Sequence, residues 1–179
     1  MSIPAPEFSR PVRIDTIGDS PRAIAVEATG AERTALAQRF TLAEVSHLAG
    51  SVTLRRNARG IAAEGRIKAA LTQICVATGD PVSESIDQPF ELLFVENADG
   101  VEAEEMELDA EDLDIVDYDG QAVDLGEALA QTMALAMDPF PRSPNADAIL
   151  RAAGVISEED ARPLGALAGL KAAMEKKGK

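Results

Sequence analysis

The chain is poor in aromatic residues, cysteine and histidine. Aromatic residues make up 3% of its 179 residues, with no tryptophan and one tyrosine. A single cysteine excludes an internal disulfide framework and fits a reducing cytoplasm. One cysteine and one histidine also fall short of the four nitrogen or sulfur ligands of a structural zinc site. We therefore expect a cytoplasmic protein with an aliphatic core and no bound metal.

Long apolar runs and nucleotide-binding motifs are also missing. No run of 18 or more apolar residues occurs, and the start MSIPAPEFSRPVRI lacks the apolar segment of a signal peptide. Neither G-x-x-x-x-G-K-[ST] nor G-x-G-x-x-G occurs between a strand and a helix. The carboxylates form no recognisable acid–base pair with a histidine or lysine. We expect no membrane span, catalytic residue, cofactor or small-molecule substrate.

Negative charge is abundant but concentrated in one segment. The net charge is −14, and residues 96–114 hold ten carboxylates without a lysine or arginine. Such blocks repel themselves and are typically solvated, and they disfavour contact with phosphates. We interpret this segment as a mobile acidic loop. An alternative is that it mimics nucleic acid and docks on a basic ribosomal protein.

The remaining pattern predicts a single α+β domain over residues 1–179. A T-x-x-E capping box predicts a helix over 30–39, and Asp124 with Glu127 starts a second helix that ends before Pro139. Between these helices, alternating apolar residues over 42–95 predict consecutive hairpins. The expected fold is an antiparallel, partly barrel-like β-sheet with two or three packed helices. Three segments are expected to lie outside this sheet: an N-terminal arm (1–12), the acidic loop (96–114) and a helical C-terminal tail (142–179).

The predicted hairpins carry several local signals. The loop RNARG (56–60) ends in glycine and suits a hairpin turn, and GDP (79–81) predicts another turn. Pro89 predicts an edge position or a bulge in its strand. LDIVDYDG, after the acidic segment, predicts a short strand that ends at an Asp-Gly turn.

Cys75 in LTQICVATGD is open to three interpretations: a metal ligand, a nucleophile, or a small buried residue at a strand end. A nucleophilic thiolate needs a neighbouring base or cation, and the sequence places His47 nowhere near it. We interpret Cys75 as a buried residue and His47 as a solvent-facing or hydrogen-bonded structural histidine.

A cluster of cations lies on the predicted hairpin, with Glu64 as the only acid among them. It could form a basic patch for RNA phosphates or an acidic protein. The alternative is a solvated face that pairs with the acidic segment of the same chain. The candidate binding residues are Arg55, Arg56, Arg59, Arg66 and Lys68.

The order of these segments resembles the YceD family over roughly residues 10–175. The resemblance is carried by TQICVAT, PFELLFV, the acidic insertion, DGQAVDLGEALAQTMALAMDPFPR and PLGALAGLK. It implies a non-catalytic factor needed for accumulation of large-subunit (23S) ribosomal RNA and for ribosome assembly. Its implied partners are rRNA, the pre-50S particle or a basic ribosomal protein. The alternative is a protein-binding adaptor unrelated to the ribosome.

The chain departs from the family in its cysteines. Many members carry C-x-x-C here and a second cysteine cluster after the helix, which together suggest zinc. In this chain Thr78 takes the place of the second cysteine, and PRSPNADAIL has none. The zinc site is therefore not transferred to this sequence.

Overall fold

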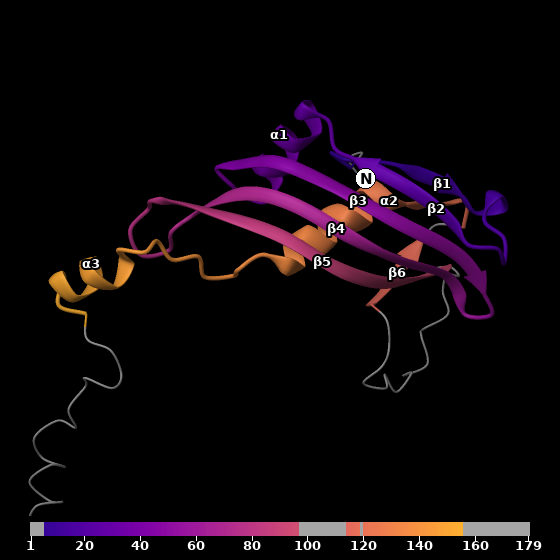
Figure 1. The fold of residues 1–179 in the computed structure, drawn as a ribbon. Helices are drawn as coiled ribbons and strands as arrows, with labels where there is room; N and C mark the ends of the chain where they lie inside the picture. The colour runs from indigo at the N-terminus through magenta and orange to yellow at the C-terminus, as the bar shows by residue number, and fades with distance from the viewer. Residues whose placement is uncertain (1–5, 97–113, 119, 156–179) are drawn as a thin grey trace, which may run out of the picture.

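The computed structural model describes residues 6–96, 114–118 and 120–155. Figure 1 shows the order of the elements along the chain. They are β1 (Pro11–Arg13), η1 (Ile14–Thr16), β2 (Arg22–Glu27), α1 (Gly30–Arg39), β3 (Glu44–Asn57), β4 (Gly60–Ile74), β5 (Pro81–Glu96), β6 (Asp114–Tyr118), β7 (Ala122–Asp124), α2 (Leu125–Ala136) and α3 (Ala146–Ala152). Most of the predicted acidic loop (96–114) and residues 156–179 of the predicted helical C-terminal tail lie outside the described residues.

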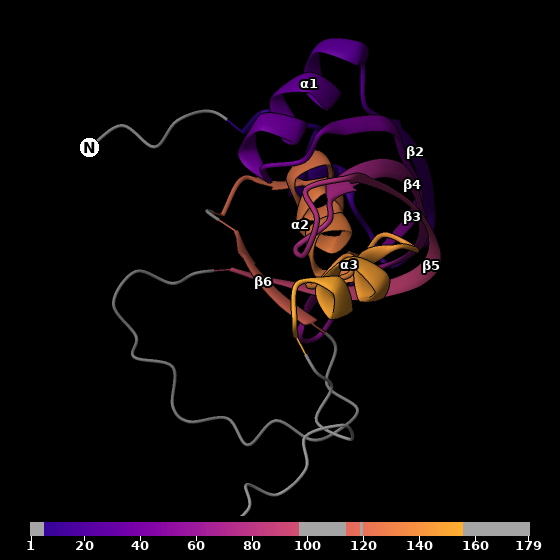
Figure 2. The same cartoon turned by 90° about the vertical axis from the view of Figure 1, so that its left-hand side faces the viewer.

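A five-stranded sheet with the order β2-β3-β4-β5-β6 forms the body of the molecule. Its first four strands are antiparallel, as predicted, whereas β6 runs parallel to β5. The sheet curves around α2 (Figure 2), but β2 and β6 do not pair, so it is not a closed barrel. The strands β1 and β7 pair with each other in a separate two-stranded sheet.

The hairpin between β3 and β4 closes at the predicted loop. Asn57 pairs with Gly60, and its side-chain Oδ1 accepts the backbone N–H groups of Arg59 and Gly60 at 2.8 and 3.0 Å. A Cβ atom on Gly60 would lie 2.2 Å from the carbonyl oxygen of Phe94, and its φ is +151°. Glycine is therefore required both by its conformation and by the close approach of β5.

The first helix begins where the sequence predicts. The Thr29 side chain accepts the backbone N–H of Glu32, and the Glu32 carboxylate accepts the N–H of Thr29, which completes the capping box. Leu36 is fully buried on the inner side of this helix. The predicted range 30–39 is confirmed in full.

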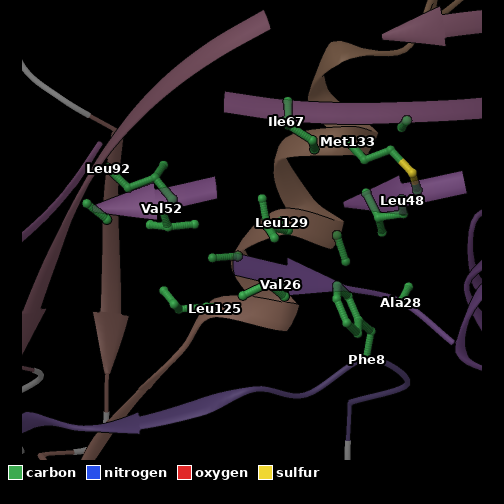
Figure 3. Packing of buried hydrophobic residues seen from close by; sticks show 14 of the residues in the cluster. Phe8, Val26, Ala28, Leu48, Val52, Ile67, Leu92, Leu125, Leu129 and Met133 are labelled. Atoms are coloured by element: carbon green, nitrogen blue, oxygen red, sulfur yellow. The ribbon is translucent and has the colours of Figure 1, made fainter. Parts of the chain in front are cut away.

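The second helix fills the concave side of the sheet. Asp124 caps it by accepting the N–H groups of Gly126 and Glu127, and Leu125, Leu129 and Met133 are buried (Figure 3). Leu129 occupies space that a side chain at position 50 of β3 would need, because a Cβ on Gly50 would lie 2.7 Å from the Leu129 Cδ2. The core thus forms between one apolar stripe of α2 and the inward-facing residues of the strands.

Residues before β1 also belong to this core. Phe8 is fully buried beside α2 (Figure 3), although residues 1–12 were expected to form an arm. Ser9 and the backbone N–H of Arg10 both donate to the Asp124 carboxylate, the latter at 2.7 Å. This segment therefore completes the N-terminal cap of α2.

Candidate functional site

The convex face of the sheet is one candidate interaction surface. In Figure 2, α2 lies inside the curve of the sheet, and no helix of the described residues covers the convex face. Small side chains line much of this face, including Ala23, Ala25, Ala49 and Ser51. A shallow hollow of about 390 Å³ lies here, and it is lined by Ala49, Gly50, Ser51, Arg66 and Lys68.

Three of the five predicted basic residues share this face. Arg66 lies opposite Ser51 in the register, Lys68 opposite Ala49, and Arg55 opposite Ala62. The Arg66 Nε donates to Asp87 Oδ1, and Lys68 Nζ lies 4.0 Å from the other oxygen of the same carboxylate. Asp87 therefore offsets part of the charge of the Arg66–Lys68 pair.

Arg56 points away from the convex face. Its guanidinium donates to the carbonyl oxygens of Ile14 at 2.7 Å and Ile17 at 3.2 Å, which satisfies acceptors at the end of η1. Its backbone N–H donates to Gly18 at 2.9 Å. The structure therefore does not bring Arg56 together with Arg55. Arg59 lies in the turn of the hairpin.

Acidic residues are interspersed with these cations on the convex face. Glu27, Glu64, Asp87 and Glu91 lie on the same side of the strands and are exposed. The pairing of β4 with β5 brings Glu91 opposite Glu64, which the sequence could not reveal. The face is consequently mixed in charge rather than a continuous basic patch.

Cys75 lies just after β4 and is 3% exposed. Its Sγ accepts the backbone N–H of Ser143 at 3.3 Å, and hydrogen bonding from Thr78 and Ser143 lowers the pKa of the thiol to about 6. The Thr78 hydroxyl oxygen also lies 2.8 Å from Asp80 Oδ2 and donates to it, so this carboxylate competes with the sulfur for the single hydroxyl proton. The backbone N–H of Ser143 is therefore the more persistent hydrogen-bond donor to the Cys75 sulfur.

This polar cluster joins the turn after β4 to the segment after α2. The Ser143 hydroxyl lies 3.1 Å from the Thr78 hydroxyl and donates to Asn145 at 2.7 Å. Nothing in the sequence signalled that Ser143 meets Cys75. Within the described residues no three potential metal ligands of the His, Cys, Asp and Glu types lie together, and His47 is exposed on β3. The arrangement fits a hydrogen-bonded anchor between these two segments.

A groove lies between the edge of β5, β6 and α2. It has a volume of about 340 Å³. Its walls include Phe90, Leu92, Val116, Ala128, Thr132 and Leu135. The carboxylates of Glu91 and Asp114 form part of the groove lining, and this lining contains no lysine or arginine. Sequence reasoning missed this groove, because it depends on the parallel placement of β6.

One of three comparisons relates the chain to known proteins. A family model described as large ribosomal RNA subunit accumulation protein YceD matches residues 63–171. No curated protein matches, and no solved structure matches. No helix in the described ranges is long and apolar enough to cross a membrane.

Proposed function

The chain belongs to the YceD family, which implies a role in large-subunit rRNA accumulation. We propose that it acts as a non-catalytic factor that binds a protein of the assembling large subunit. The observation that carries this proposal is the mixed charge of the convex face, together with the acidic lining of the groove beside β5. Both surfaces suit a protein partner better than a phosphate backbone.

The predicted basic patch gives weaker support for direct RNA contact. Arg56 is engaged with backbone carbonyl groups, and Asp87 lies beside both Arg66 and Lys68. Phosphate recognition gains from several uncompensated cations, because each phosphate contact releases a counterion. Contact with rRNA through Arg55, Arg59, Arg66 and Lys68 therefore stands as the second candidate. The hollow beside Arg66 and Lys68 is the observation in its favour.

Sedimentation of the tagged full-length protein tests the function. We expect it to migrate with precursors of the large subunit, and we expect depletion to lower large-subunit rRNA relative to small-subunit rRNA. A protein confined to the free fractions during active assembly would contradict the proposal. Capture of a single partner without any change in rRNA would support the unrelated adaptor instead.

A charge-reversal pair separates the two candidate modes of contact. The test variant combines Arg55→Glu with Lys68→Glu, and the matched control combines Arg142→Glu with Arg151→Glu. Contact of a protein with the acidic groove predicts equal sedimentation of both variants, whereas a loss confined to the test variant that depends only weakly on salt indicates a protein on the convex face. Contact through RNA predicts a selective loss in the test variant and steep weakening as salt rises.

A further inference from the structure

We propose that the groove between β5 and α2 binds an extended, basic peptide, which adds to the sheet as a further strand at the edge of β5. This inference deepens the proposed function and rests on it in one respect, namely that the peptide belongs to a protein of the assembling large subunit. Three independent features of the described residues support it: an open strand edge, an exposed apolar contact and an acidic rim.

The open edge comes from the unequal lengths of β5 and β6. β5 runs from Pro81 to Glu96, whereas β6 pairs only with Leu92–Glu96. In the part of the chain that the structure describes, residues 82–91 pair with β4 on one side and with no strand on the other. An open edge presents backbone donors and acceptors that an incoming strand satisfies.

Proline limits which part of this edge provides hydrogen bonds. Pro89 has no N–H group, so main-chain pairing is best from Val82 to Gln88, which contains no proline. The groove lies at the downstream end of that stretch, where Phe90 and Leu92 form part of the wall. Main-chain pairing and side-chain recognition are thus adjacent along one strand.

The apolar contact comes from the outer side of α2. Leu135 lines the groove and is 81% exposed, whereas Leu129 and Met133 of the same helix are buried. A single exposed leucine has no special meaning, but this one lies opposite Phe90 across a groove. It provides an apolar surface for one side chain of a peptide whose alternate residues face the sheet's concave side.

The carboxylates around the groove favour a basic peptide over an acidic one. Glu91 lies on the convex side of the strand edge, and Asp114, which pairs with Leu92, lies on the concave side. Both carboxylates are exposed, and the groove lining holds no cation. Lysine or arginine on either face of an added strand therefore meets a carboxylate, whereas an acidic peptide or an RNA phosphate is repelled.

Binding is measured with full-length protein and a fluorescent nine-residue peptide of alternating lysine and valine at fixed ionic strength. Comparison peptides carry glutamate for lysine, or N-methyl groups on alternate residues, which remove strand hydrogen bonds. We expect both changes to weaken binding at least tenfold. Absence of binding by the lysine–valine peptide, or equal binding by either comparison peptide, overturns the proposal.

Variants locate the site. We expect Glu91→Lys with Asp114→Lys to weaken peptide binding at least tenfold and Leu135→Ala to weaken it about threefold. The matched controls are Glu27→Lys with Glu44→Lys, and the exposed Ile149→Ala; these should change binding less than twofold. Equal loss in test and control variants overturns the assignment to the groove. Direct binding of a fluorescent single-stranded oligonucleotide that Leu135→Ala weakens would assign the groove to RNA and overturn the proposal as well.

Sedimentation separates failure of this inference from failure of the proposed function. If the unmodified protein migrates with large-subunit precursors and the Glu91→Lys, Asp114→Lys variant does so equally, the function stands and the groove is not the contact. If the unmodified protein never migrates with them, the proposed function fails whatever the peptide result.

Discussion

Arg10 and Glu32 are joined by two hydrogen bonds of 2.7 and 2.9 Å, which connect the N-terminal segment to the first turn of α1. The same carboxylate accepts the backbone N–H of Thr29 at 2.7 Å. The Arg10 guanidinium is the main cause that lowers the pKa of Glu32 to about 2. One side chain therefore serves both a helix cap and a long-range ion pair.

The first prediction concerns acid stability. Because the folded-state pKa of Glu32 is depressed, its contribution is present above the unfolded-state pKa and is lost as pH falls through the window from about 4.5 to about 2. The Glu32→Gln variant should therefore be less stable than the unmodified chain at pH 6. Between pH 5 and pH 3, however, its free energy of unfolding should fall by less than that of the unmodified chain. Urea unfolding at each pH measures this. The exposed Glu44→Gln is the control, and an equal slope for both variants would contradict the prediction.

A second prediction concerns the contact of α2 with the N-terminal segment. A Cβ on Gly126 would lie 2.5 Å from the carbonyl oxygen of Phe8 and 3.0 Å from the backbone nitrogen of Arg10. Alanine normally stabilises a helix relative to glycine, but here backbone atoms must move. Gly126→Ala should lower the free energy of unfolding by about 1–3 kcal/mol, as measured by urea denaturation.

Gly18→Ala is the control for that substitution, since a Cβ there meets nothing within 4 Å. We expect it to change stability by less than about 0.5 kcal/mol. A neutral Gly126→Ala would mean that the close approach of Phe8 to the helix does not persist in solution.

A third prediction separates two neighbouring arginines. Arg56 binds the carbonyl groups of Ile14 and Ile17, whereas Arg55 extends from the opposite, convex face. Arg56→Ala should destabilise the protein by about 1 kcal/mol, because two acceptors lose a charged donor. Arg55→Ala should leave thermal unfolding nearly unchanged. If Arg55→Ala and Arg56→Ala reduce stability equally, the assignment of different roles to these two side chains is wrong.

A fourth prediction concerns the Cys75 thiol. Its ultraviolet thiolate absorbance should titrate with a midpoint near pH 6 in the folded protein and near the ordinary thiol value of about 8.5 in urea. Thr78→Val should raise the folded midpoint, because it removes a hydroxyl donor. Alkylation of the folded protein should nevertheless be slow, since Cys75 is buried. A folded midpoint that Thr78→Val leaves unchanged would exclude Thr78 as a donor to the sulfur.

Local signals in the sequence were enough to predict α1, the start of α2 and the β3–β4 hairpin. In each of these, a capping side chain or a turn glycine acts within a few residues of the chain. Pro89 also occurs where a local signal predicts it, in the part of β5 that β6 does not cover. The helix α3 lies within the predicted helical C-terminal tail (142–179), but its bounds were not predicted, because its seven residues carry only a short apolar pattern.

The candidate site depended on information that the sequence does not hold. One part could have been predicted: adjacent side chains of a strand point to opposite faces, so Arg55 and Arg56 could not both belong to one patch. The partners of Arg66 and Lys68 come from β5, about 20 residues later, and depend on the strand register. The groove depends further on β6 running parallel to β5, which no hairpin rule predicts.

The attachment of residues 8–10 to the start of α2 has a consequence for how the chain folds during synthesis. Ser9 and Asp124 are 115 positions apart, so this contact forms only after most of the chain has been made, whereas Arg10 can meet Glu32 much earlier. Contacts between such distant positions slow folding, because a long loop must close first. Phe8 therefore lacks the apolar surroundings that α2 provides until that helix has emerged, and a nascent chain stopped before residue 124 should be far more sensitive to protease than one stopped after residue 145.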